Sequence, residues 1–118
     1  LQVSKKKTID KPWGYEEIWA NTNSYVGKLI CINPGARLSK QYHQKKEETI
    51  YVVEGVLINY DENDVEHRFF PGQSLHIPVG TVHRFGATDK SYVKVIEVST
   101  NYLDDVVRLE DDYGRSKT

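Results

Sequence analysis

The chain has 118 residues, 38% of them hydrophobic, and a formal net charge of −1. This length suits one domain with its own core, and the near-neutral charge gives no reason to expect a nucleic-acid or membrane partner. No apolar run approaches the ~20 residues of a membrane span, and no apolar leader follows a basic start, so we expect a cytoplasmic protein. The single cysteine, Cys31, excludes an intrachain disulfide, and we expect it to be a small buried strand residue.

Both ends are polar, so we predict a flexible arm over 1–10, a folded domain over 11–115 and a short tail over 116–118. Between the ends, short segments rich in Val, Ile, Tyr and Phe alternate with turn residues, a pattern typical of β-strands. The predicted strands are Tyr15–Ala20, Tyr25–Ile32, Thr49–Glu54, Val56–Tyr60, His67–Phe70, Ser74–Ile77, Val82–Phe85 and Tyr92–Val98. This spacing predicts an antiparallel sandwich or barrel. The segment Asp104–Leu109 suits either a last strand or one helical turn.

Four residues with metal-binding side chains fall on or beside these strands. Gln41 and His43 are two positions apart, so on a strand their side chains point the same way. Glu48 follows a polar turn and starts the next strand, which can bring it back beside His43. His83 follows the turn Pro78-Val79-Gly80-Thr81. If the two hairpins face each other, the four donors converge inside the barrel.

This donor set favours an open metal site. Imidazole and carboxylate ligands suit zinc first, with iron, manganese, cobalt or nickel as alternatives. Without thiolates, a closed structural zinc site is not expected, and a free position for water or substrate is.

The joint spacing carries this prediction, because a single strand histidine is more often exposed or hydrogen-bonded than a ligand. The other two histidines have no such partners nearby. We predict an exposed strand residue at His67. His76, two residues before Pro78, is compatible with facing either the cavity or solvent.

These residues resemble the two motifs of the cupin family. The matching positions are Gly35, His43, Glu48, Gly55, Gly72, Pro78, Gly80 and His83. Gln41 replaces the first His of the usual pair, and Ala87 stands where Asn is usual. The resemblance implies an all-β, single-domain cupin, that is, a jelly-roll β-barrel or double-stranded β-helix.

Further segments resemble the type II mannose-6-phosphate isomerase domains. They are Lys11–Gly14, Leu38–His43, Ile77–Arg84 and Val106–Arg115. In that family Gln takes the first ligand position, so the resemblance implies a divalent metal held by Gln41, His43, Glu48 and His83. It also implies a sugar-phosphate substrate, interconversion of mannose 6-phosphate and fructose 6-phosphate, and a homodimer.

The chain departs from that family between Gln44 and Glu47, where a His- and Arg-rich stretch is usual. Lys46 falls where an Arg is thought to assist catalysis, and Lys lacks the planar guanidinium fork. The candidates for the proton-transferring residue are Lys46, Glu47 and His76. The candidates for binding the phosphate are Lys40, Lys46, Arg84 and Arg115.

Three other functions follow from the same residues. The altered Gln44–Glu47 stretch suits a non-catalytic sugar-binding or regulatory cupin. Two histidines and one carboxylate also form the ligand triad of iron(II) dioxygenases. A metal-free sugar epimerase is the third alternative, although it would not need this ligand set.

Overall fold

The computed structural model describes residues 1–115, which form strands and turns with no helix among them. The all-β prediction is confirmed, whereas the expected tail over 116–118 lies outside the described residues. Within residues 1–115 there is therefore no helix long and apolar enough to cross a membrane. The strands are β1 (Lys7–Lys11), β2 (Gly14–Asn21), β3 (Val26–Ile32), β4 (Lys40–Tyr42), β5 (Glu48–Glu54), β6 (Leu57–Tyr60), β7 (Glu66–Phe69), β8 (Ser74–Ile77), β9 (Arg84–Ala87), β10 (Val93–Ser99) and β11 (Val107–Glu110).

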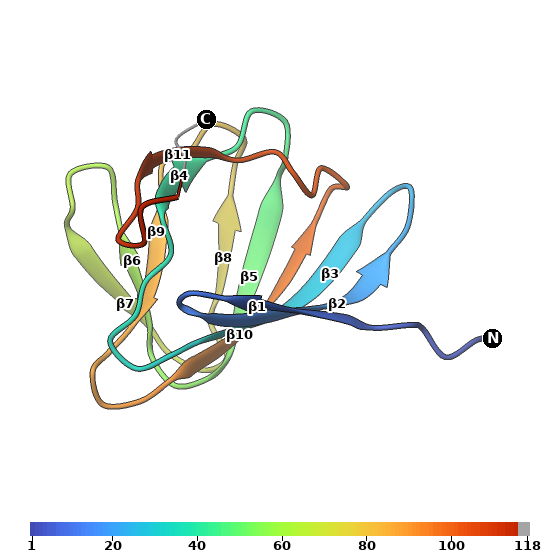
Figure 1. Cartoon of the computed structure of the whole chain (residues 1–118), viewed down its shortest axis with the longest axis horizontal. Helices are drawn as coiled ribbons and strands as arrows, with labels where there is room; N and C mark the ends of the chain where they lie inside the picture. Colours follow the sequence, from blue (N-terminus) through green and yellow to red (C-terminus); the bar gives the residue numbers. More distant parts are fainter. Residues whose placement is uncertain (116–118) are drawn as a thin grey trace.

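Two layers of antiparallel strands face each other and make a jelly-roll barrel (Figure 1). The larger layer is a six-stranded sheet with the order β1-β2-β3-β10-β5-β8. The opposite layer combines the sheet β7-β6-β9 with the pair β11-β4. Backbone bridges from Arg37 to Gly86 and from Gln41 to His83 connect these two parts.

The apolar core lies between the layers because alternate residues of the central strands point inward. Ile50 and Val52 on β5 and Val93 and Val95 on β10 are at most 1% exposed. Leu57 on β6 belongs to the same cluster from the opposite layer. Burial of each such side chain stabilises the fold by ~1.5–3 kcal/mol.

The first strand corrects the prediction of a flexible arm over 1–10. Residues Lys7–Lys11 form β1, which pairs along its length with β2, from Lys7 opposite Ile18 to Lys11 opposite Gly14. The strand is polar and lies at the sheet edge, where main-chain hydrogen bonds need no apolar alternation. This is why composition alone did not reveal it. Residues 1–6 carry no strand and are exposed.

The segment left open between strand and helix contains β11, which starts at Val107 and pairs with β4. Pairing with β4, which is distant in the sequence, makes this segment a strand, and the local sequence does not show that pairing. Cys31 is buried on β3, as expected. His67 is exposed on β7 and bonds to Asp61, which also agrees with the prediction.

Candidate metal centre

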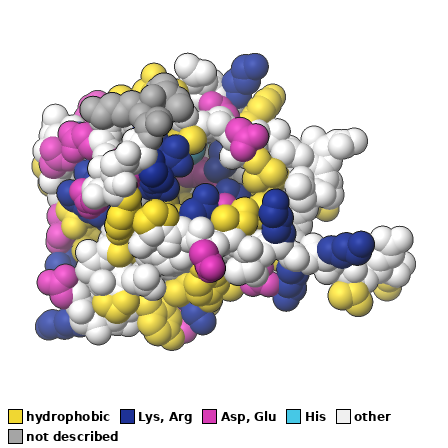
Figure 2. Space-filling model, viewed as in Figure 1, with side chains coloured by type: hydrophobic (Ala, Val, Ile, Leu, Met, Phe, Trp, Pro, Cys, Tyr) yellow, Lys and Arg dark blue, Asp and Glu magenta, His cyan; other side chains and the backbone are white. Residues whose placement is uncertain are grey.

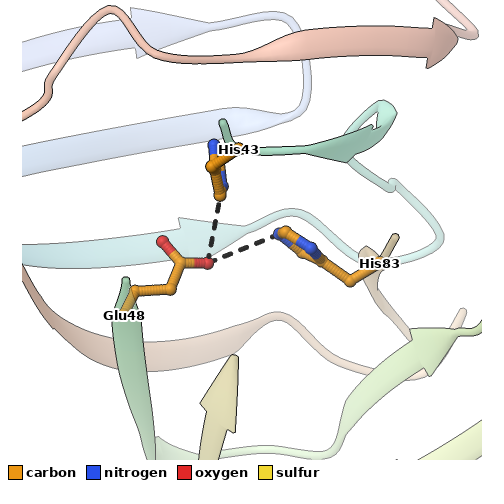
Figure 3. A group of neighbouring side chains, drawn as sticks. All are labelled: His43, Glu48 and His83. Atoms are coloured by element: carbon orange, nitrogen blue, oxygen red, sulfur yellow. Dashed lines mark ion pairs between the residues drawn. The ribbon is translucent and has the colours of Figure 1, made fainter. Parts of the chain in front are cut away.

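Three side chains from separate segments meet inside the barrel. His43 follows β4, Glu48 begins β5 and His83 precedes β9 (Figure 3). The Nε2 atoms of His43 and His83 lie 3.8 Å and 3.4 Å from Oε1 of Glu48. One ligand atom from each of the three residues lies within 4.8 Å of the others. All three residues are at most 5% exposed.

Main-chain hydrogen bonds hold the two histidine segments side by side. The backbone N–H of Gln41 donates to the carbonyl of His83 at 3.0 Å, and His83 donates back at 2.9 Å. The N–H of Gly80 donates to the carbonyl of His43 at 2.8 Å. Glu48 is placed by the large sheet, where it lies opposite Ser99 on β10. The predicted convergence of the two hairpins is therefore a property of the backbone.

The second nitrogen of each imidazole is occupied by a backbone carbonyl. Nδ1 of His43 bonds to the Asp105 carbonyl at 2.5 Å, and Nδ1 of His83 bonds to the Thr81 carbonyl at 2.9 Å. A carbonyl oxygen only accepts, so Nδ1 carries a proton. In the protonated ring Nε2 also donates, to Glu48, whereas in the neutral ring, the form that binds a metal, Nε2 presents its lone pair to the cavity. Metal-ligating histidines are oriented in this way.

Lys46 lies between two buried carboxylates next to this cluster. Its Nζ is 3.0 Å from Oε2 of Glu48 and 3.1 Å from Oε2 of Glu97. Burial lowers the pKa of Lys46, but the charges of Glu97 and Glu48 outweigh burial and raise this pKa. Lys46 therefore stays protonated and compensates the two acids.

The two acids respond oppositely to the same environment. Burial raises the pKa of Glu48, but hydrogen bonds from His43 and His83 and the charge of Lys46 hold it well below its usual value. Burial and the neighbouring Glu48 raise the pKa of Glu97 to about 7. Glu48 is thus the ionised carboxylate that faces the imidazoles.

A row of alternating charges continues from this cluster across the inner face of the large sheet. Lys28 on β3 lies directly opposite Glu97 on β10. Its Nζ is 3.5 Å from Glu16, which also lies 3.9 Å from Nζ of Lys11. Sequence reasoning missed Glu16, Lys28 and Glu97, although a charged residue at an inward position of an apolar strand is a usable signal.

A cavity of about 110 Å³ opens over this row and over the three ligand candidates. It has room for several waters or part of a small ligand. Gln41, the fourth predicted ligand, is half-buried and lines the same cavity. Lys and Arg side chains gather around a hollow in the face shown in Figure 2.

Two of the predicted phosphate-binding residues face away from this cavity. Nζ of Lys40 bonds to the Glu62 carbonyl at 2.9 Å, and the Arg84 guanidinium bonds to the Leu38 carbonyl and to Asp112, both at 2.9 Å. Lys40 precedes the cavity residue Gln41 on β4, and Arg84 precedes the cavity residue Phe85 on β9. Successive side chains of a strand point to opposite faces, so Lys40 and Arg84 point away from the cavity.

Arg115 does line the cavity. Its guanidinium is held by two hydrogen bonds to Asp111, at 2.8 and 3.0 Å.

Two of the candidates for proton transfer lie outside the cavity. Nε2 of His76 is 2.6 Å from Oε2 of Glu47, and both side chains are more than half exposed. His76 lies on β8 opposite Thr49 and faces solvent, which closes the alternative left open by the sequence. Lys46 is the one member of the three that lines the cavity.

Asp105 is a site residue that sequence reasoning did not find. Its carboxylate accepts the backbone N–H groups of Gln44, Lys45 and Lys46 at 2.7–3.1 Å, while its carbonyl binds His43. These partners are about 60 residues away in the chain. No local pattern in the sequence predicts this contact.

Comparison with known proteins identifies the family of this chain. The family model described as "Mannose-6-phosphate isomerase C-terminal" matches residues 2–111. The chain belongs to this family. The alginate biosynthesis protein AlgA of Pseudomonas aeruginosa is 38% identical over 111 residues, covering 92% of this chain and 23% of AlgA.

A mannose-1-phosphate guanylyltransferase of Escherichia coli is 36% identical over 113 residues, again covering 92% of this chain and 23% of the relative. The chain thus spans about a quarter of the length of these relatives. A solved structure described as a sugar phosphate isomerase of the cupin superfamily, from Silicibacter pomeroyi, superposes with a TM-score of 0.62. It is 25% identical, and the match covers 73% of this chain and 59% of that protein.

The fold is therefore a cupin fold, and its His/Glu/His cluster is compatible with a divalent metal. Three buried donors within reach of one another, two of them imidazoles oriented by backbone carbonyls, fit such an ion. Imidazole nitrogen and carboxylate oxygen leave the choice among zinc, iron, manganese, cobalt and nickel open.

Proposed function

We propose that this domain is a metal-dependent sugar-phosphate isomerase that interconverts mannose 6-phosphate and fructose 6-phosphate. The observation that carries the proposal is the convergence of His43, Glu48 and His83 in a buried cavity of a domain of this family. Gln41, which lines that cavity, completes the proposed ligand set. Zinc is the first candidate for the ion.

A divalent ion bound here would supply Lewis-acid polarisation of the carbonyl and neighbouring hydroxyl oxygens of the sugar. The protein residues hold and orient that site. Glu48 contributes the ionised carboxylate, and the backbone carbonyls of Asp105 and Thr81 fix the two imidazoles. Lys46, held protonated between two acids, stabilises negative charge that develops in the cavity.

The decisive assay is a coupled measurement of turnover with mannose 6-phosphate in the presence of zinc, cobalt, manganese or iron(II). We expect turnover with at least one ion, and none in the His43→Ala/His83→Ala variant. His76→Ala is the matched control, because this histidine is exposed and lies outside the cavity. Absence of turnover with every ion would reject the isomerase proposal.

A non-catalytic sugar-phosphate-binding module is the second candidate. The observation that favours it is the position of Glu47 and His76, which bond to each other at the surface and leave the cavity without them. This function predicts that mannose 6-phosphate raises the melting temperature without being converted, because a ligand of the native state stabilises it. Oxygen uptake with iron(II) would instead support a dioxygenase.

We also propose a homodimer, as the family resemblance implies. Apolar side chains are exposed on the outer face of neighbouring strands β5 and β10, namely Tyr51, Val53 and Val98. Light scattering after size-exclusion chromatography tests this, and a monomer at all concentrations would contradict it. The cytoplasmic location stays a prediction.

A further inference from the structure

Arg108 on β11 differs from the other arginines of the chain. Its Nε is buried without a hydrogen-bond partner, and within residues 1–115 no ion pair joins its guanidinium to an acidic side chain. The other four arginines each bond to at least one carboxylate. They are Arg37, Arg68, Arg84 and Arg115.

The strand register directs Arg108 into the cavity beside the candidate metal centre. Arg108 lies directly opposite Gln41 in the antiparallel pair of β11 and β4. Residues opposite each other place their side chains on the same face, with Cβ atoms about 4.5–5.5 Å apart. Both side chains accordingly line the same cavity.

Among the residues that line the cavity, no carboxylate forms an ion pair with Arg108, because each has other partners. The three acids of the charged row, Glu16, Glu97 and Glu48, lie beside the three lysines of the same row, Lys11, Lys28 and Lys46. Arg115 is neutralised by Asp111. Asp105, the remaining acid that lines the cavity, directs its carboxylate oxygens to three backbone N–H groups. A guanidinium with a buried and unpaired nitrogen costs free energy, which an anionic ligand would relieve.

We infer that Arg108 binds the phosphate group of a phosphorylated sugar whose other end lies at His43, Glu48 and His83. A guanidinium presents two parallel N–H donors that match a phosphate monoester in geometry and charge. This role differs from that of Lys40 and Arg84, which bind protein groups outside the cavity. The inference rests on the proposed function only for the class of ligand and requires no turnover.

The test uses metal-free protein, dialysed free of chelator, so that phosphate cannot bind through an ion. Inorganic phosphate and mannose 6-phosphate are titrated by calorimetry, with unphosphorylated mannose as the comparison ligand. We expect Arg108→Gln to weaken binding of both phosphate compounds about tenfold or more, and Arg108→Lys to weaken it less. Mannose binding should not change. Arg68→Gln is the matched control, because this strand arginine is exposed and paired with Glu66.

Stability separates a ligand-binding role from a structural one. Ligand-free Arg108→Gln is expected to melt no lower than the parent, because the side chain bonds to no described carboxylate. Phosphate affinity within twofold of the parent in both Arg108 variants would overturn the inference, whether or not the parent isomerises sugars. Arginine-dependent phosphate binding without turnover would instead reject the isomerase proposal and leave this inference standing. If Arg108→Gln does not fold, Arg108→Lys, which keeps the charge but loses the fork, decides the question.

Discussion

At the residue scale, Lys46 is the cation on which two buried carboxylates depend. Glu48 is 3% and Glu97 5% exposed, and both lie within 3.1 Å of its Nζ. Removing one partner of a buried ion pair is strongly destabilising, since the remaining charge has neither water nor a counter-ion. The fold therefore needs a positive charge at position 46.

We predict that Lys46→Met lowers the free energy of unfolding of the metal-free protein by about 3–5 kcal/mol at pH 8. Without Lys46 the folded-state pKa of Glu97, already raised to about 7, rises further above its ordinary value. The stability lost in the variant therefore grows as pH rises through about 7, the pKa of Glu97 in the parent, and shrinks as pH falls toward 5. Urea unfolding at both pH values measures it. Lys45→Met is the exposed control, and a deficit independent of pH would contradict this explanation.

Gly55 is a residue whose backbone the fold requires. Its φ is +82°, and an added Cβ would lie 2.3 Å from the carbonyl oxygen of Tyr92. Gly72 has a φ of +92° but open space around it. We expect Gly55→Ala to destabilise clearly more than Gly72→Ala, which costs only the conformational strain of ~1 kcal/mol. Equal midpoints in urea would show that the contact with Tyr92 is unimportant.

At the element scale, the segment that follows β11 is tied down by an ion pair. The Arg115 guanidinium donates to both oxygens of Asp111. These hydrogen bonds, which outweigh the effect of burial, lower the pKa of Asp111 to about 2. Asp105, Arg108 and Arg115 all line the cavity, so the chain from Asp105 to Arg115, which includes β11, forms one side of it.

We predict that Asp111→Asn lowers the free energy of unfolding by about 1–2 kcal/mol at pH 7. A depressed pKa stabilises the fold above the ordinary value of 3.8, and this contribution is lost as pH falls through about 2. The difference between parent and variant should therefore narrow between pH 4 and pH 2. Urea unfolding across this range is the measurement, with Asp104→Asn as the exposed control. A constant difference would indicate a packing effect.

At the scale of the whole molecule, the site is assembled from elements that meet only in the folded state. Metal binding should therefore couple to folding. We predict that added zinc raises the melting temperature of the parent in proportion to the logarithm of its concentration, and that chelation reverses this. The His43→Ala/His83→Ala variant should not respond. An equal response in both proteins would place the bound ion elsewhere.

The residue pattern by itself determined the class of fold and the identity of the metal ligands we propose. Alternating apolar residues and glycine turns predicted the strands, because side-chain period and turn chemistry are local properties. The spacing of Gln41, His43, Glu48 and His83 indicated a shared site for the same reason. Edge strand β1 was not predicted, because its main-chain hydrogen bonds require no apolar alternation in its polar sequence.

Only the tertiary structure decided which charged residues face the cavity. Lys40 and Arg84 are neighbours of cavity residues in the sequence, yet strand alternation turns them to protein partners on the other side. Arg108, Glu97 and Asp105 reach the site through strand pairings and loop contacts with distant segments. The physical reason is that burial and ion pairing depend on contacts across the barrel, which the order of residues along one strand does not encode.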